Sequence, residues 1–165
     1  MAEPRKILIY DERLGGTPPW QNVQATCLVN QKHSMTSIVN WLNTKCMKYQ
    51  GQETVYIMAH GDAGYVQLGK EGLTEETAYM WGSLGENYRI HRIIILACSV
   101  AAGKKGHYFG SRLAWYTNAY VTAATAKQHY FYLPFGILPT TFLDWSGTVY
   151  TWDPGGELNP GLSFP

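Results

Sequence analysis

The sequence has too few cysteines, in the wrong pattern, for a disulfide framework or a zinc site. Cys27, Cys46 and Cys98 are odd in number, and none belongs to a C-x-x-C pair. Structural zinc sites and small disulfide-bonded domains typically show such pairs or an even count. We therefore expect at least one free thiol, no bound metal and no cofactor.

The sequence also lacks an excess of charge and a long apolar run. Thirteen basic and twelve acidic residues give a formal net charge of +1, without the basic excess typical of nucleic-acid-binding domains. No stretch approaches the roughly 18 apolar residues of a membrane span, and the short apolar run before Asp11 is no signal peptide. We expect no nucleic-acid partner, no membrane span and, for the chain as encoded, a cytoplasmic location.

Two common catalytic and phosphate-binding motifs are missing as well. The nucleophile elbow G-x-S-x-G does not occur, which disfavours a serine hydrolase. "GYVQLGK", residues 64–70, has the spacing of a phosphate loop, but Glu71 stands where Ser or Thr should hold magnesium. Its apolar residues alternate, so we interpret it as a hairpin. "YDERLGG", after the first predicted strand, has charges where a nucleotide-binding domain would have glycines.

What the sequence does contain is an alternation of apolar strands and amphipathic helices. Its 165 residues are 45% hydrophobic, which fits a single domain over residues 1–165. The apolar runs are too continuous for a sheet with one wet face. We expect an α/β fold, a three-layer sandwich with a mostly parallel central sheet and helices on both faces. The patterns predict strands over 6–10, 53–60, 92–98, 119–125 and an edge strand over 146–154, with helices over 34–51, 73–84 and 107–118.

His60 and Cys98 stand at the ends of two of these predicted strands. The 38 positions between them (98 − 60 = 38) leave room for a crossover, so the strands are predicted to be parallel neighbours. The carboxyl ends of parallel strands form the edge where α/β proteins bind ligands. A thiol and an imidazole meeting there would be a nucleophile and its general base.

Small residues surround this pair. Gly61 follows His60 directly, and its N–H together with that of Cys98 predicts an oxyanion hole. Residues 99–103 are Ser, Val, Ala, Ala and Gly, which offer little side chain to fill space. We therefore interpret this loop as one that leaves a cleft for a substrate backbone.

The two motifs resemble those of a known family. "YIMAHGDAG" and "IIILACSVAAG" are similar to the His-Gly and Ala-Cys motifs of caspase-like (clan CD) cysteine peptidases, and residues 55–125 resemble caspase-like domains of large bacterial surface and toxin proteins. The resemblance implies a caspase-like fold and hydrolysis of peptide bonds in protein substrates through an acyl-enzyme. It implies His60 as general base, Cys98 as nucleophile and Gly61 as an oxyanion donor.

The resemblance also bears on specificity and biology. Many family members have an acidic residue or Gln just before the Ala-Cys pair or nearby, whereas Leu96 stands there in this chain, so P1 specificity does not transfer. A toxin or effector role would imply delivery to a target cell and a dedicated inhibitor or immunity protein.

Candidate substrate-binding residues lie beside the predicted strand ends. Asp11 follows the first strand and would favour a basic P1 residue, while Arg13 would favour an acidic one. Ala97 and Ser99 flank Cys98 and are further candidates. The aromatic residues of the C-terminal half are expected mainly in packing, and some could line an apolar substrate pocket: Tyr130, Phe131, Tyr132, Phe135, Phe142 and Trp145.

Other interpretations of the same residues stay open. Taken alone, Cys98 fits a buried apolar thiol and His60 a packed histidine; only their joint placement favours catalysis. A caspase-like domain can also lose its chemistry and serve as a protein-binding module. A cysteine phosphatase is a weaker alternative, because Lys104 stands where the C-x5-R loop needs an arginine.

Overall fold

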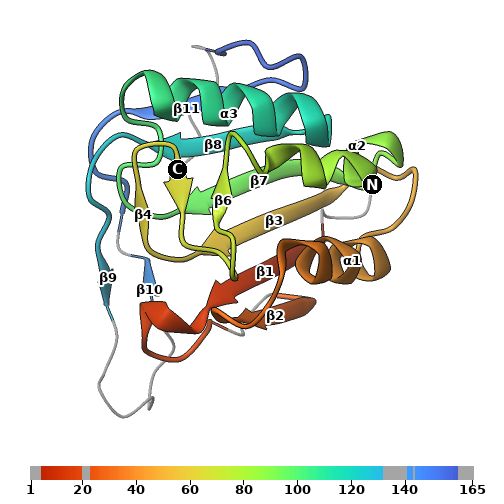
Figure 1. Cartoon of the computed structure of the whole chain (residues 1–165), viewed down its shortest axis with the longest axis horizontal. Coiled ribbons are helices and arrows are strands. Elements are labelled where there is room, and N and C mark those ends of the chain that lie inside the picture. The colour runs from red at the N-terminus through yellow and green to blue at the C-terminus, as the bar shows by residue number, and fades with distance from the viewer. Residues whose placement is uncertain (1–4, 20–22, 132–140, 143, 160–165) are drawn as a thin grey trace.

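A six-stranded sheet forms the centre of the molecule (Figure 1), and its strand order is β11-β8-β7-β3-β1-β2. The computed structural model describes residues 5–19, 23–131, 141–142 and 144–159. Every neighbouring pair is parallel except β8 and β11. The prediction of an α/β fold with a mostly parallel sheet is confirmed. The strands are β1 Lys6–Asp11, β2 Ala25–Val29, β3 Glu53–Met58, β7 Ile90–Leu96, β8 Tyr120–Ala124 and β11 Val149–Trp152.

The α-helices pack on one face of this sheet, which we call the helix face. Figure 1 shows α1 (Met35–Lys45), α2 (Gly82–Glu86) and α3 (Gly103–Thr117) on the same side. The 3-10 helix η2 (Ala78–Trp81) directly precedes α2 and packs on the same face. This face buries the larger apolar cluster, to which the strands contribute Ile7, Ile9, Val29, Val55, Ile57, Ile93, Ile95, Val121 and Ala123.

The opposite face carries a smaller cluster and is called the hairpin face. Strand residues Leu8, Tyr10, Met58, Ile94 and Leu96 form this cluster with Leu14. The short 3-10 helix η1 (Glu12–Leu14) and the pair β9 (Tyr130–Phe131) and β10 (Thr141–Phe142) contribute to its cover. The sandwich thus has its expected third layer, but the described part of that layer is built from a 3-10 helix and a hairpin.

The handedness of parallel connections explains this division. Such crossovers are right-handed in nearly all proteins. The chain moves across the sheet in one direction from β2 to β3, from β3 to β7 and from β7 to β8, which brings α1, α2 and α3 to one face. The step from β1 to β2 runs the opposite way and carries η1 to the other face.

The first helix begins where the sequence predicts and ends earlier. The hydroxyl of Ser34 caps α1 by accepting from the N–H of Ser37 at 3.1 Å. The helix ends at Lys45, short of Gly51, because Cys46 is extended. The carbonyl of Cys46 accepts from Arg89 Nη1 at 2.6 Å, so a tertiary contact takes the place of another helical turn.

Four other elements also need comment. The second helix begins with η2 rather than near Glu75, and β2 lies at a sheet edge where no strand was predicted. The segment predicted as a hairpin forms a small antiparallel sheet of β4 (Gly61–Asp62), β5 (Tyr65–Val66) and β6 (Leu73–Thr74), which confirms the hairpin prediction. The late edge strand is confirmed as β11.

Within the described ranges the longest helix is α3, with 15 residues, and no helix there meets the length and apolarity that a bilayer crossing requires.

Candidate active site

The parallel pairing of β3 and β7 places His60 and Cys98 beside each other. Met58 and Leu96 are the last register partners of the two strands. His60 and Cys98 each follow by two residues, so both leave the sheet at its carboxyl edge. The prediction that these strands are parallel neighbours is confirmed.

Strand alternation then points both side chains to the hairpin face. Met58 and Leu96 belong to the cluster on that face, and residues two positions apart along a strand share a face. A cavity of about 240 Å³ opens there, and both His60 and Cys98 line it. Its other lining residues are Leu14, Ala59, Lys127, Gln128, His129 and Tyr130.

The main chain of η1 holds the imidazole of His60. Nε2 lies 3.0 Å from the carbonyl oxygen of Arg13. A carbonyl oxygen can only accept a hydrogen bond, so the ring carries its proton on Nε2. Nδ1 of the neutral ring is therefore unprotonated and able to take a proton, as a general base requires.

The thiol of Cys98 contacts the main chain of Gln128. Its Sγ accepts from the N–H of Gln128 at 3.3 Å and lies 3.6 Å from the carbonyl oxygen of the same residue. Among the described residues no hydrogen bond joins Sγ to His60. Both polar main-chain groups of Gln128 therefore contact the half-buried thiol, as the main chain of an extended peptide bound at this position would.

The side chain of Gln128 anchors this contact. It is buried, and its amide donates to the carbonyl oxygens of Ala126 at 2.6 Å and Ser146 at 2.9 Å. Its Oε1 accepts from the N–H of Ser146 at 3.0 Å. Three hydrogen bonds therefore fix residue 128 over Cys98, and we call residues 127–130 the cover segment.

Gly61 lies tightly against the peptide of Cys98. A Cβ on Gly61 would stand 2.7 Å from the carbonyl oxygen of Cys98 and 2.9 Å from the Cβ of Ala97. Only glycine allows this approach without a shift of the backbone. In the described part of the chain the N–H of Cys98 has no hydrogen-bond partner, so it is available to an incoming oxyanion.

The small residues after Cys98 do not leave the cleft that we expected. Val100 and Ala101 are fully buried, and a Cβ on Gly106 of α3 would stand 2.2 Å from the backbone of Ala101. The carbonyl of Val100 accepts from the N–H of Gly64 at 2.9 Å. The interpretation of residues 99–103 as a substrate cleft is therefore wrong: they are small because α3 and the β4–β5 turn pack closely on them.

The backbone just after the thiol has an uncommon conformation. Ser99 has a φ of 57°, in the left-handed region that non-glycine residues rarely occupy. Its N–H donates to the carbonyl of Ala126 at 2.9 Å, which holds the turn in place. Ser99 is not among the residues that line the cavity, and Ala97 is fully buried on the helix face. The assignment of Ala97 to substrate binding is thus wrong.

Asp11 and Arg13 bind each other instead of offering a charge to substrate. The guanidinium of Arg13 meets both carboxylate oxygens of Asp11, at 2.8 and 2.6 Å, and this contact raises the pKa of Arg13. Asp11 is fully buried and also accepts from the N–H of Gly69 at 3.2 Å. It follows Ile7 and Ile9 on the helix face, so its side chain points away from His60. The charge-based P1 assignments to Asp11 and Arg13 are therefore wrong.

Sequence reasoning missed three residues of the cover segment as part of the site, whereas it named Tyr130 as one that could line a pocket. Lys127, Gln128 and His129 follow β8, whose carboxyl end meets the same edge as those of β3 and β7. That position was the available signal. The hydroxyl of Tyr130 is buried without a partner among the described residues, and burial, with the nearby Cys98, raises its pKa, so it stays a neutral donor.

Aromatic residues nearby mainly pack, as predicted. Tyr130, Phe142 and Trp145 pack against the cluster of the hairpin face, with ring centroids 5.7 and 5.1 Å apart along the series. Tyr132 and Phe135 lie outside the described residues, and the side chain of Phe131 is not described.

All three thiols are free, which confirms the cysteine prediction. Burial raises the pKa of Cys27 to about 11 and that of Cys46 to about 12. Neither thiol is therefore a ready nucleophile at neutral pH. Within the described ranges, no three His, Cys, Asp or Glu side chains gather as a metal site would need.

Comparison with known proteins gives a family without an assigned role. No curated protein matches the sequence. A family model described as a domain of unknown function, DUF4347, matches residues 12–128, which is more than half of the chain. The match includes His60, Cys98 and Gln128. The chain therefore belongs to the DUF4347 family.

Proposed function

We propose that this chain is a caspase-like cysteine endopeptidase in which His60 is the general base and Cys98 the nucleophile. One observation carries the proposal: two neighbouring parallel strands end in an imidazole and a thiol that line the same cavity. The unused N–H of Cys98, the close approach of Gly61 and the oriented ring of His60 support it. The caspase-like resemblance of the two motifs adds to these features.

The first half of the reaction forms an acyl-enzyme. Nδ1 of His60 takes the proton of the Cys98 thiol, and Sγ attacks the carbonyl carbon of the scissile bond. The carbonyl oxygen becomes an oxyanion, which the N–H groups of Cys98 and Gly61 stabilise. The C–N bond then breaks, and the leaving amine takes the proton from His60.

The second half releases the product and restores the thiol. Water gives a proton to Nδ1 of His60 as its oxygen attacks the thioester carbon. The C–S bond breaks, the new carboxyl group leaves, and the thiolate regains its proton. Throughout, the hydrogen bond from Nε2 to the carbonyl of Arg13 keeps the ring in one orientation.

The cover segment occupies the place of substrate in this resting arrangement. Both main-chain groups of Gln128 contact Sγ, so the thiol proton is directed to Gln128 rather than to His60. A substrate main chain that displaces Gln128 would free the thiol for its base. The proposal therefore includes a movement of residues 127–130 before the first turnover.

The phosphatase alternative finds no support in the loop after Cys98. A phosphate cradle needs free backbone N–H groups around the thiol. The N–H groups of Ser99 and Ala101 already donate to the carbonyls of Ala126 and Ala124, at 2.9 and 3.0 Å. A toxin or effector role, an inhibitor protein and a cytoplasmic location stay predictions.

Cleavage of a denatured proteome tests the proposal directly. The parent protein, Cys98→Ala and His60→Ala would be incubated with it, and new amino termini would be identified by mass spectrometry. We expect cleavage by the parent and none by either variant, with circular dichroism showing that all three are folded. Cleavage that persists in Cys98→Ala would refute the assignment. Folded parent protein that cleaves nothing, even with Gln128→Ala to loosen the cover segment, would favour the binding module.

A further inference from the structure

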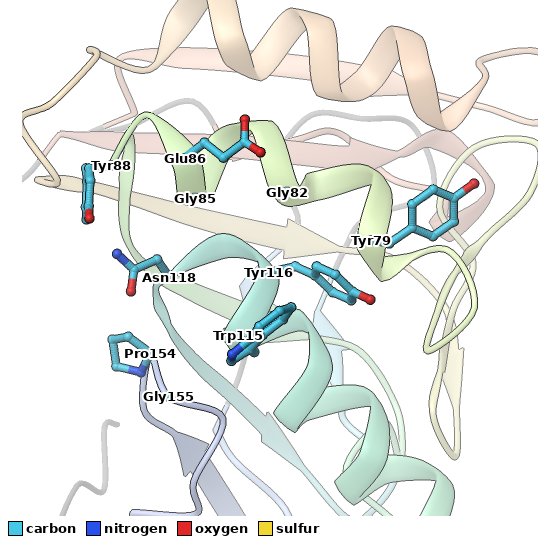
Figure 2. Close-up of a pocket in the computed structure, with 10 residues that line it drawn as sticks. All are labelled: Tyr79, Gly82, Gly85, Glu86, Tyr88, Trp115, Tyr116, Asn118, Pro154 and Gly155. Atoms are coloured by element: carbon cyan, nitrogen blue, oxygen red, sulfur yellow. The ribbon is translucent and has the colours of Figure 1, made fainter.

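A second cavity, of about 600 Å³, lies between the segment 79–88 and the end of α3 (Figure 2). One wall of the cavity is formed by η2, α2 and the residues that follow α2. The last turn of α3 forms the other wall, and Pro154, which follows β11, lies beside it. Four aromatic residues line it: Tyr79, Tyr88, Trp115 and Tyr116. We call it the aromatic groove.

The rings of this groove are unusually accessible. Tyr79, Tyr88 and Trp115 are 60%, 56% and 58% exposed. Large exposed aromatic surfaces on one patch are typical of binding sites, since leaving them in water is unfavourable. Accessible rings gathered around a cavity therefore point to a ligand.

The spacing of the rings indicates an extended ligand. Of the four, only Trp115 and Tyr116 form a ring contact among the described residues, with centroids 5.1 Å apart and planes at 74°. Figure 2 shows Tyr79 at one end of the groove and Tyr88 at the other. A cage for one small cation needs rings around a single point, so this arrangement fits a longer molecule better.

The polar groups of the four aromatic residues are able to donate to a ligand that accepts hydrogen bonds. The three tyrosine hydroxyls and the indole N–H of Trp115 make no hydrogen bond within the described part of the chain. A proline-rich peptide in the polyproline II conformation offers free carbonyl groups and, at each proline, no N–H. Its rings pack well on aromatic side chains. An oligosaccharide can also bond tyrosine hydroxyls, which both donate and accept, so it is the competing occupant in the binding test.

Charge complementarity adds one feature of the ligand. Glu86 is the only charged residue among those that line the groove, and α3 ends there without a basic residue in its last turn. The carbonyl end of a helix favours a nearby cation. We propose that the aromatic groove binds a proline-rich peptide segment of a partner protein that carries a basic residue beside its prolines.

Binding of a defined peptide tests this, in the full chain with Cys98→Ala so that no cleavage can interfere. The probe is decaproline with one terminal arginine, and the reference is a Gly-Ser peptide of the same length with the same arginine. Isothermal titration should show the decaproline peptide binding at least about tenfold more tightly. No binding of decaproline at millimolar concentration, or binding of cellohexaose in its place, would overturn the proposal.

Substitutions in the groove assign the site. Trp115→Ala should weaken decaproline binding at least about tenfold. Gly82→Leu should do the same by filling the groove, because Gly82 is helical and no atom lies within 4 Å of where its Cβ would be. Tyr108→Ala is the matched control: it lies on α3, is 57% exposed and is not in the groove. An equal loss in Tyr108→Ala would contradict the assignment.

The arginine of the probe gives a separate readout. Glu86→Gln should weaken the arginine-bearing decaproline several-fold at low salt and leave plain decaproline unchanged. Equal effects on both peptides would refute the role given to Glu86. Because the background lacks Cys98, these outcomes are independent of the proposed peptidase activity.

Discussion

Arg13 connects His60 to Asp11 across the thickness of the sheet. Its carbonyl oxygen lies 3.0 Å from Nε2 of His60, while its guanidinium meets the Asp11 carboxylate at 2.6 and 2.8 Å. Asp11 lies fully buried on the helix face, whereas His60 lines the cavity on the hairpin face. The orientation of the proposed base therefore depends on an ion pair on the other side of β1.

Removing the carboxylate should therefore weaken both the fold and the site. Asp11→Ala removes the carboxylate that accepts from the partly exposed Arg13 guanidinium and from the N–H of Gly69. It should lower the free energy of unfolding by about 1–3 kcal/mol, measured by urea denaturation. In the fraction that stays folded, kcat should fall because His60 loses its support. Glu12→Gln, an exposed change in the same 3-10 helix, is the control and should alter neither quantity. A change of P1 charge preference in Arg13→Gln would show that the pair does read substrate.

Gly61→Ala should inactivate the site through crowding. The new methyl would stand 2.7 Å from the carbonyl of Cys98, so we expect a loss of about 1–3 kcal/mol of stability and of most activity. Gly82→Ala is the comparison, because its Cβ would enter open space in a helix. That variant should gain up to about 1 kcal/mol. A fully active Gly61→Ala enzyme would argue against the oxyanion role.

Thiol labelling should single out Cys98. At pH 7.5 the raised pKa values of Cys27 and Cys46 leave less than about one part in a thousand as thiolate. Iodoacetamide should therefore modify Cys98 first, as peptide mapping would show. Gln128→Ala removes three anchoring hydrogen bonds and should speed this reaction several-fold. Lys127→Ala, at the exposed neighbour, should not. Faster labelling of Cys27 than of Cys98 would contradict this expectation.

Acid sensitivity should decrease when His91 is replaced. Burial, together with the charge of Arg92, lowers the pKa of His91 below 6.5 in the folded protein. As the pH falls below 6.5 the unfolded chain binds this proton more readily, so folding is disfavoured. His91→Phe keeps a ring beside Tyr120 and should lose less melting temperature between pH 7.5 and 5.0 than the parent. An unchanged pH dependence would refute this role of His91.

The ends of the predicted strands identified the site correctly. The errors arose because the face of the sheet to which each candidate side chain points was not considered. His60 and Cys98 were correctly placed because each follows an apolar run that could only be a buried strand. Asp11 was placed at the correct edge, yet counting in steps of two from Ile7 and Ile9 puts it on the helix face. The same count would have removed Ala97 from the candidates.

Other features depend on contacts between distant segments. The grip of Gln128 on Cys98 spans 30 positions, and no local pattern indicates it. The two faces of the sheet are covered differently because of the direction of each crossover. Those directions cannot be predicted without knowing that β2 lies at the edge of the sheet. The five residues of β2 have an exposed, alternating edge pattern that gave no strong strand signal. The small residues after Cys98 were read as empty space because their packing partners, Gly64 and Gly106, belong to other elements.

Helix α3 spans the distance between the two cavities. Its first turn rests on the loop after Cys98, where a Cβ on Gly106 would meet Ala101, and near its last turn a Cβ on Gly85 would stand 2.1 Å from the Tyr116 carbonyl. Fifteen residues make a rod of about 22 Å. Ligands at the two ends cannot touch, so any influence of one on the other would have to pass along this rod. Comparing the rate of the proposed peptide cleavage with the aromatic groove empty and occupied would then show whether α3 transmits such an influence.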